Sequence, residues 1–317
     1  MFLALAGGVG AARFLAGLVR VVDPAELVIV GNTGDDEIFH GLRVSPDLDT
    51  VTYTLAGAVG STGWGLEGDT FTALEALARY GEPTWFNLGD RDLATHIYRT
   101  SRLAAGATLS QVTGEITRAW GVKARLVPMS DERVATRLEV TDAGGAGPVS
   151  TTMQEWFVRD RCEPPVAAVH FDGAAEAAPA PGVLDAIAAA DGIFVCPSNP
   201  VISLGPILAV PGIREALARR REQVVGVSPI IKGATVKGPA DRLMAATGIE
   251  VSCVGVARAY ADICGTLLID SLDADRAGDV EEAGVRPLVA PILMRDTGGA
   301  ERLARATIGS LAIESGR

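Results

Sequence analysis

The stretch FLALAGGVGAAR, residues 2–13, joins an apolar segment to closely spaced glycines. Residues 2–6 have the composition of a buried strand, residues 7–10 that of a glycine turn, and residues 11–21 that of a helix. Strand, glycine turn and helix in this order open a nucleotide-binding βαβ unit. In such a unit the backbone N–H groups of the turn and the helix N-terminus can approach a phosphate. We therefore predict an α/β fold with a doubly wound, mostly parallel, Rossmann-like sheet.

The glycine turn matches the dinucleotide-binding pattern G-x-G-x-x-G only in part. Counted from Gly8 and Gly10, the third glycine position holds Arg13. The turn also lacks the Lys-Ser/Thr pair of a P-loop, and no acidic residue ends the next strand to hold a ribose. A purely structural strand–helix turn therefore stays an alternative. Arg13 favours an anion site, because a guanidinium can bind phosphate through two hydrogen bonds.

Residues 28–50, VIVGNTGDDEIFHGLRVSPDLDT, place four carboxylates behind a second apolar strand: Asp35, Asp36, Asp47 and Asp49. Carboxylates this close in sequence repel one another unless cations or hydrogen-bond donors accompany them. Ligands of open α/β sheets bind outside the carboxyl ends of the strands. We predict that these four aspartates hold a metal ion in a metal-assisted phosphate site.

Asp47 and Asp49 are separated by one residue in the segment PDLDT, residues 46–50. In an extended chain this spacing places both carboxylates on one face, and Pro46 disfavours helix for the residue before it. We expect an extended approach followed by a helix over residues 51–58. The alternative is that Asp49 or Thr50 only caps that helix. A cap explains one aspartate and leaves the others unexplained.

A second polar cluster occupies residues 86–96, FNLGDRDLATH. Asp92 and His96 are four residues apart and share one face of an expected helix. A Gly-Asp-Arg-Asp turn can also be ordinary helix capping. The sequence therefore favours neither a structural role nor a functional role for this cluster over the other. The tryptophans are candidate walls for a planar ligand, although most tryptophans belong to a core: Trp64, in the glycine-rich loop 60–69, and Trp85, Trp120 and Trp156.

The rest of the pattern predicts a single domain, residues 1–317, with an inserted α+β portion resembling a cap at about residues 93–165. The strands at 193–196 and 224–227 end in PSNP and SPI, whose polar groups either contact a nucleotide or only form turns. The expected helices are 70–80, two pieces within 93–120, 183–190, 240–246, 257–264 and 300–313. The remaining expected strands are 27–30, 124–128, 134–140, 149–158 (after a turn at 144–148), 251–254, 267–269 and 288–293.

Composition narrows the class of protein. The chain has 317 residues, is 48% hydrophobic and carries a formal charge of −11, which argues against general nucleic-acid binding. A small anionic substrate is compatible with this charge because bound Mg²⁺ can reverse the local field.

The four cysteines show no C-x-x-C spacing, so we expect reduced thiols rather than zinc or disulfides. No apolar run reaches the roughly 20 residues of a membrane span, and the first strand lacks a basic leader. We expect a cytoplasmic protein.

Taken in order, the motifs resemble the 2-phospho-L-lactate transferase family (CofD/FbiA), which assembles the deazaflavin coenzyme F420. No single motif is decisive, but the ordered set spans nearly the whole chain. The matching pieces are GGVGAARF (7–14), NTGDD (32–36), HG (40–41), SPDLDT (45–50), LGDRDLATH (88–96), SDE (130–132), QEW (154–156), PSNP (197–200) and SPI (228–230).

The resemblance implies a transfer at phosphorus. The terminal ribitol hydroxyl of the 5-deazaflavin Fo (7,8-didemethyl-8-hydroxy-5-deazariboflavin) attacks a guanosine diphosphate-linked donor, and GMP leaves. The donor carries phospholactate, phosphoenolpyruvate or phosphoglycerate, and the residues do not choose among them. The resemblance further implies Mg²⁺ as cofactor, GDP and GMP as ligands, and a homodimer.

The same resemblance gives roles to residues. Asp49 is the better candidate for the base, and Asp47 shares the catalytic and metal-binding role, with Asp35 and Asp36 supporting the metal. Substrate binding falls to three groups. Those facing the diphosphate are Gly8, Gly10 and Arg13, with Asn32 as a neutral partner of the metal. Those on the Fo side are Asn87, Gly89, Asp90 and His96, and those near the guanosine are Ser198, Asn199 and Pro229. Thr50 is also expected to bind substrate.

Two rival functions use a related fold. A regulator that binds a UDP-sugar without transferring it would keep the glycine turn, but it would not need the paired aspartates or a pocket for a tricyclic ring. The segments 46–50 and 89–96 favour the transferase. An NAD-dependent oxidoreductase is disfavoured by Arg13 at the third glycine position and by the missing ribose acid.

Overall fold

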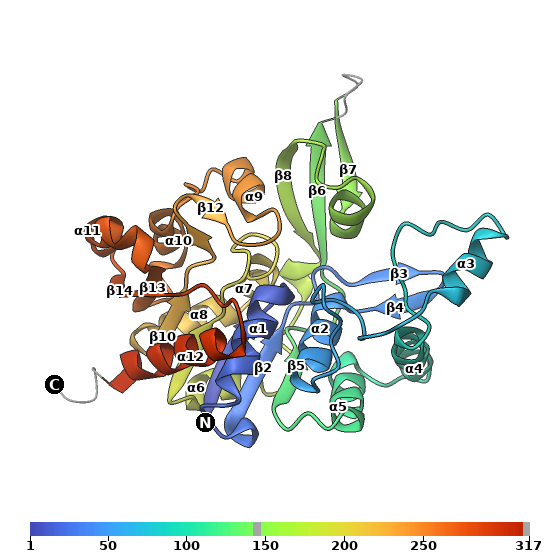
Figure 1. The fold of residues 1–317 in the computed structure, drawn as a ribbon, viewed down its shortest axis with the longest axis horizontal. Helices are drawn as coiled ribbons and strands as arrows, with labels where there is room; N and C mark the ends of the chain where they lie inside the picture. Colours follow the sequence, from blue (N-terminus) through green and yellow to red (C-terminus); the bar gives the residue numbers. More distant parts are fainter. Residues whose placement is uncertain (142–146, 313–317) are drawn as a thin grey trace.

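Seven parallel strands form the centre of the molecule (Figure 1). The computed structural model describes residues 1–141 and 147–312. The chain starts in the middle of the sheet, winds to one edge, returns to the middle and winds to the other edge, which confirms the doubly wound fold. In spatial order the strands are β14 (Arg286–Ala290), β13 (Thr266–Asp270), β10 (Val224–Val227), β9 (Gly192–Val195), β1 (Phe2–Ala6), β2 (Leu27–Gly31) and β5 (Arg125–Pro128).

The sheet separates two hydrophobic cores, and the side chains of β1 alternate between them. Leu3 and Leu5 enter one core, whereas Ala4 and Ala6 enter the other, as the two-residue period of a strand requires. Strands buried on both faces read as continuous apolar runs, which is why the sequence predicted them. The Leu3 side packs α6 (Val183–Ala189), α8 (Ile213–Ala218) and α10 (Cys253–Tyr260); the Ala4 side packs α1 (Gly8–Leu18), α2 (Pro46–Leu55) and α12 (Thr297–Ala312).

Smaller elements surround the carboxyl edge of the central sheet. Figure 1 shows one antiparallel sheet projecting from the body and a hairpin, β3–β4, that reaches out beside α3. The projecting sheet consists of β7 (Pro148–Thr152), β6 (Ala135–Thr141) and β8 (Val166–Asp172). The remaining strands are β3 (Glu37–Phe39), β4 (Leu42–Val44), β11 (Ile230–Ile231) and β12 (Ala234–Thr235). The remaining α-helices are α3 (Thr72–Ala78), α4 (Asp92–Ala104), α5 (Leu109–Ala119), α7 (Gly205–Ala209), α9 (Ala240–Ala246) and α11 (Ala277–Glu282). Short 3-10 turns lie at Pro24–Glu26, Ala174–Glu176, Arg221–Gln223 and Ser271–Arg276, and a π-helical turn lies at Glu155–Arg159.

Several sequence predictions need correction. The segment 93–165 is not one insertion, because α4 and α5 lead into β5 at the edge of the central sheet and the antiparallel sheet continues to Asp172. The strand expected at 251–254 is wrong: the Ser252 hydroxyl accepts from the Gly255 N–H and caps α10. The strand expected at 149–158 ends at Thr152. Short apolar runs fit both helix and strand periods. Most of the turn expected at 144–148, and the end of the last helix at 313, lie outside the described residues.

Within residues 1–141 and 147–312, no helix combines the length and the apolar composition that crossing a bilayer requires.

Candidate active site

The loops that follow β1 and β9 meet where the winding direction of the sheet reverses. The Ser198 hydroxyl donates to the carbonyl oxygen of Gly7 at 2.9 Å. A Cβ at Gly10 would lie 2.3 Å from the carbonyl oxygen of Pro197, so only glycine permits this approach. Gly8 has φ +73°, a left-handed conformation that favours glycine. Ligands of doubly wound sheets bind at this switch point.

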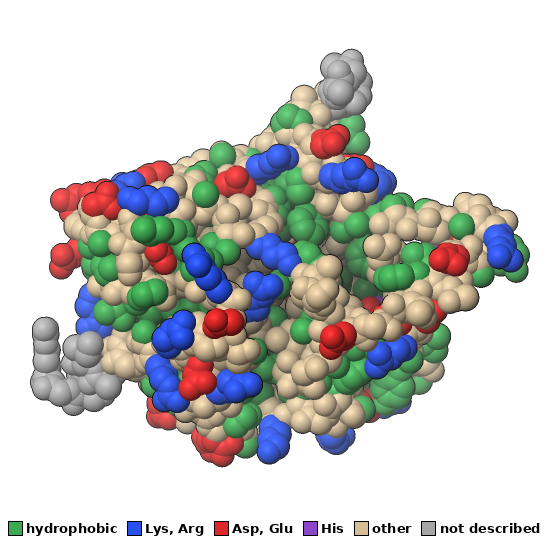
Figure 2. Space-filling model, in the orientation of Figure 1, with side chains coloured by type: hydrophobic (Ala, Val, Ile, Leu, Met, Phe, Trp, Pro, Cys, Tyr) green, Lys and Arg blue, Asp and Glu red, His purple; other side chains and the backbone are tan. Residues whose placement is uncertain are grey.

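A cavity of about 670 Å³ opens at the switch point. Figure 2 shows Lys and Arg side chains gathered around a hollow near the centre of this face. Most of the residues that the sequence singled out line this one cavity: Gly8, Gly10, Arg13, Asp35, Asp47, Asp49, Thr50, Asn87, Gly89, His96, Ser198, Asn199 and Pro229. Three others do not line it: Asn32, Asp36 and Asp90.

Asn32 holds two of the cavity's carboxylates together from behind. Its buried side-chain amide donates to Asp47 Oδ2 at 2.9 Å and to Asp35 Oδ2 at 3.2 Å. Burial raises the pKa of Asp47 to about 6, although hydrogen bonds from Asn32 and the Gly8 N–H oppose the shift. Burial, and then the charge of Asp47, raise the pKa of Asp35 well above its usual range. Two buried carboxylates beside one another favour a cation between them.

The four aspartates do not form one cluster, contrary to the sequence prediction. Asp36 turns away from the main cavity, accepts a hydrogen bond from the Ser45 hydroxyl at 2.6 Å, and lines a second cavity of about 400 Å³. Across the described part of the chain, no three His, Cys, Asp or Glu side chains are grouped so that they alone could hold a metal ion. A cation at Asp35 and Asp47 would therefore need further oxygen ligands from a substrate or water.

Asp47 and Asp49 lie in the first turn of α2, not in extended chain. Pro46 is at the start of the helix, where its missing N–H is no loss, and carboxylates there complement the helix dipole. Neither Asp49 nor Thr50 caps the helix, whose cap position is Ser45. Residues two apart on a helix face different directions. Asp47 therefore contacts Asn32 whereas Asp49 contacts α4.

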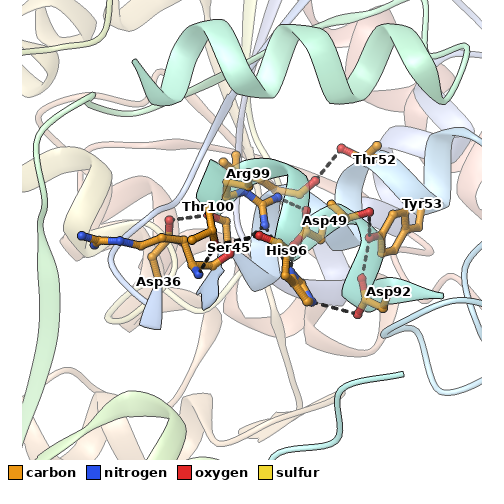
Figure 3. Close-up of polar contacts among 12 residues, drawn as sticks. Asp36, Ser45, Asp49, Thr52, Tyr53, Asp92, His96, Arg99 and Thr100 are labelled. Carbon is orange, nitrogen blue, oxygen red and sulfur yellow. Dashed lines mark hydrogen bonds and ion pairs between the residues drawn. The ribbon is translucent and has the colours of Figure 1, made fainter. Parts of the chain in front are cut away.

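Asp49 belongs to a buried polar network that joins α2 to α4 (Figure 3). The Arg99 guanidinium donates to Asp49 Oδ1, and His96 Nδ1 lies 3.7 Å from Asp49 Oδ2. His96 Nε2 lies 3.3 Å from Asp92 Oδ2, so the two residues do share a helical face. Asp49 Oδ2 has no hydrogen-bond partner among the described residues. Arg99 thus holds one oxygen of Asp49, while the other oxygen is buried without a hydrogen bond and lies near His96.

The far end of this network is Tyr53. Burial, and then the charges of Asp49 and Asp92, raise the pKa of Tyr53 far above its usual value, so its hydroxyl stays protonated and donates to Asp92 Oδ1 at 2.5 Å. Burial acts to raise the pKa of Asp92, but the hydrogen bond and charge of His96 are the first of several contributions that lower it overall. A charged Asp92 lies against the His96 ring.

Some residues of the segment 86–96 have a structural role, and others line the cavity. Asp90, predicted to bind substrate, accepts from the Thr72 and Ala73 N–H groups and the Thr70 hydroxyl, and so fastens the start of α3. Asn87 and Gly89 do line the cavity. Among the tryptophans, Trp64 lines the cavity and packs edge-on against Phe157 at 6.0 Å, whereas Trp156 is fully buried.

Sequence reasoning missed Arg99, which holds Asp49 and lines the second cavity, and it missed Tyr53 and Lys237, which line the main cavity. Arg99 had a signal, because with Asp92 and His96 it shares one face of α4 at positions i, i+4 and i+7. Tyr53 and Lys237 had none: the first resembles a core residue of α2, and the second lies in a loop without periodicity. The side-chain amide nitrogen of Asn199 is buried without a hydrogen-bond partner among the described residues, which suits a phosphate or ribose oxygen.

Comparison with known proteins gives a consistent result. The family model described as 2-phospho-L-lactate transferase CofD matches residues 2–284. A phosphoenolpyruvate transferase of Streptomyces griseus is 47% identical over 307 residues, covering 96% of both chains, and one of Thermobifida fusca is 46% identical over 321 residues, covering 98% of this chain and 97% of its own. A UPF0052-family protein of Bacillus halodurans has the same fold, with a TM-score of 0.61 at 17% identity over 97% of this chain and 98% of its own. Family model and relatives together show that this chain belongs to the CofD family of transferases, which act in coenzyme F420 biosynthesis.

Proposed function

We propose that this chain transfers a phosphoenolpyruvate group from a guanosine diphosphate-linked donor to the terminal ribitol hydroxyl of Fo, releasing GMP. The choice of phosphoenolpyruvate among the three acids rests on the names of the relatives at 46–47% identity. The observation that most directly supports this reaction is a single cavity whose two ends are chemically different. Asp35 and Asp47 lie beside the glycine turn, and the free oxygen of Asp49 lies beside α4.

The donor's diphosphate belongs at the glycine turn. Backbone N–H groups at the start of α1 and the Arg13 guanidinium supply positive potential there. Ser198 and Asn199 come from the neighbouring loop at the same edge of the sheet. The unpartnered amide nitrogen of Asn199 offers a donor to a ribose or phosphate oxygen of the guanosine half.

Asp35 and Asp47 fit a magnesium ion. Magnesium is bound in many phosphate sites by one or two carboxylates plus substrate oxygens. These two carboxylates lie side by side, joined by the Asn32 amide, and the Gly8 N–H also donates to Asp47. When bound there, Mg²⁺ would neutralise the diphosphate and stabilise the charge that develops on GMP as it leaves. The structure separates Asp36 from this pair, so Asp36 has no place in the proposed site.

Asp49 is proposed as the base. The ribitol oxygen forms a bond to the phosphorus that bears the enolpyruvyl group, the bond from that phosphorus to the bridging oxygen breaks, and GMP leaves with the bridging oxygen. The hydroxyl proton passes to Asp49 Oδ2, which has no other hydrogen bond to lose. Arg99 holds the other carboxylate oxygen and keeps Asp49 oriented.

The deazaflavin ring fits the apolar wall of the cavity. Trp64, Phe71, Phe86 and Phe157 line it, with Asn87 between them. Aromatic side chains can pack against a planar tricyclic ring, as in other apolar cofactor pockets. A homodimer is proposed from the family alone.

The test is direct. Purified protein is incubated with Fo, the guanosine diphosphate-linked phosphoenolpyruvate donor and Mg²⁺, and products are separated and weighed by mass spectrometry. The expected result is one GMP for each Fo-phosphoenolpyruvate diester, with the Asp49→Asn variant inactive. If neither Fo nor the donor binds and a UDP-sugar does, the protein is a regulator and the proposal is wrong. Incubations with the phospholactate and phosphoglycerate donors check the choice of acid.

A further inference from the structure

Two loops meet over the cavity beside the glycine turn, where Gly63 of one loop approaches the side chain of Val9. The first is closed by a bridge between Val59 and Leu66 and carries Trp64. The second follows β12 and carries Lys237. The Lys237 ammonium donates to the carbonyl oxygen of Thr62 at 2.5 Å and lies 4.1 Å from the centroid of the Trp64 ring, a cation–π distance. Both residues line the cavity. Lys237 therefore fastens one loop to the other.

The Lys237 ammonium has no anionic partner among the described residues. It forms no ion pair with any carboxylate of residues 1–141 and 147–312, although several carboxylates line the same cavity. Arg13 likewise makes no hydrogen bond or ion pair to the described residues. Burial, and then the charge of Arg13, lower the pKa of Lys237. The two cations are thus close enough to repel each other, and an anion bound between them would remove that repulsion.

We propose that Lys237 binds the carboxylate of the three-carbon acid of the donor and leaves Thr62 to do so. This inference rests on the proposed function. Arg13 lies on α1 beside the glycine turn, where its planar fork suits a phosphate. Lys237 approaches from a separate loop, and a compact ammonium suits a second anionic group some distance from the diphosphate. The carboxylate is the only other anionic group of such a donor.

The position of Lys237 also couples the two substrates. Trp64 contacts Phe157 on one side and Lys237 on the other. When Lys237 moves to the carboxylate, the Trp64 loop loses both of its contacts with Lys237. Arrival of the acid thus changes the wall against which the acceptor ring packs. Lys237 acts here as a specificity-determining residue that touches the donor.

The decisive experiment compares donor and GDP, which share the nucleotide and diphosphate but differ in the acid. Lys237→Met keeps an unbranched side chain, one atom shorter than that of lysine, and removes the charge. Its KM for the donor is expected to rise at least about tenfold, as for the loss of one charged hydrogen bond. Its Kd for GDP is expected to change less than twofold. Lys237→Arg should recover part of the affinity for the donor.

Two variants serve as controls. Arg13→Met is expected to weaken GDP and donor alike. Lys232→Met removes a lysine in the turn between β11 and β12, where Lys232 pairs with Asp275 at 3.4 Å and does not line the cavity. This variant should change neither affinity. The proposal is overturned if Lys237→Met weakens GDP as much as the donor, because Lys237 then binds phosphate. It is equally overturned if Lys237→Met affects neither ligand.

A binding measurement separates this inference from the proposed function. Tryptophan fluorescence is followed while phosphoenolpyruvate alone, and then GDP alone, is titrated into the protein, with Trp64→Phe as the blank. A change with phosphoenolpyruvate that needs both Trp64 and Lys237 supports the anion site even if no transfer to Fo is found. Normal transfer in Lys237→Met with an unchanged KM for the donor rejects the inference while leaving the transferase in place.

Discussion

Arg99 and Asp49 form an ion pair beneath the surface, with only 2% and 7% of their side chains exposed. Asp49 comes from the first turn of α2 and Arg99 from α4, so the pair joins two helices through residues that are fifty positions apart in the sequence. The pair occupies one carboxylate oxygen and leaves the other without a hydrogen bond, 3.7 Å from His96 Nδ1, in a residue that lines the cavity. A base that is oriented at one oxygen and free at the other is prepared for a substrate hydroxyl.

Removing one partner of this pair should destabilise the protein strongly. Arg99→Met leaves Asp49 charged and buried, which is expected to cost about 3–5 kcal/mol of unfolding free energy. The double variant Arg99→Met/Asp49→Asn leaves no uncompensated charge and should be more stable than Arg99→Met alone. Urea denaturation of Arg99→Met, of Asp49→Asn, of the double variant and of the parent protein measures this. Additive losses in the double variant would mean that the two side chains do not interact.

Magnesium dependence should distinguish Asp47 from Asp36. Asp47→Asn removes a proposed ligand, so the Mg²⁺ concentration for half-maximal transfer should rise by about tenfold or more. Asp36→Asn is the matched control, because Asp36 lies eleven positions before Asp47 but lines the other cavity. It should leave the Mg²⁺ requirement unchanged. Equal shifts in both variants would restore the four-aspartate site that the sequence predicted.

The sequence predicted the strands of the sheet well and the arrangement of the aspartates poorly, and the physical reasons differ. Strands buried on both faces are continuous apolar runs, and their glycine-ended turns mark the carboxyl edge. The segment at Asp47 and Asp49 fits an extended chain by its proline and a helix by its acidic first turn. Only the packing of α2 against α4 decides between them, because it supplies Arg99 to Asp49. Local sequence carries no information on that contact.

Asp90 and Lys237 show two ways in which motifs fail to identify the residues of a site. Asp90 lies in the family-like segment LGDRDLATH, yet its carboxylate is used by the start of α3. Lys237 belongs to none of the motifs, yet it lines the cavity beside Trp64. A motif indicates which segment reaches the site. Which side chains of that segment face the ligand depends on the competing demands of neighbouring helices.

Acid should weaken the attachment of α4 to α5. Hydrogen bonds from Arg102 and Tyr98 lower the pKa of Glu115 to about 2, so its contribution to stability is present above the unfolded pKa, near 4.3, and is lost as pH falls toward 2. Glu115→Gln should melt at a lower temperature than the parent protein at pH 7, with the difference narrowing below about pH 4.3. Calorimetry across this range tests the sign, and a difference that widens in acid would contradict it.

Adding one methyl group at Gly10 should damage the site, whereas adding one at Gly114 should not. A Cβ at position 10 would lie 2.3 Å from the carbonyl oxygen of Pro197, so Gly10→Ala must push the glycine turn away from the loop that carries Ser198 and Asn199. Gly114 is inside α5, where an added Cβ would meet no atom of the described residues within 4 Å outside its own helix backbone and chain neighbours. Gly114→Ala should therefore stabilise the helix by about 0.5–1 kcal/mol.

The two glycine variants are compared by thermal melting and by the Kd for GDP. Gly10→Ala is expected to lower the melting temperature and to weaken GDP by about tenfold or more, since a displaced turn no longer aims its N–H groups at the diphosphate. Gly114→Ala should bind GDP normally. Retained GDP affinity in a folded Gly10→Ala variant would show that the diphosphate does not depend on the contact between the β1 and β9 loops, and the placement of the nucleotide at the switch point would have to be abandoned.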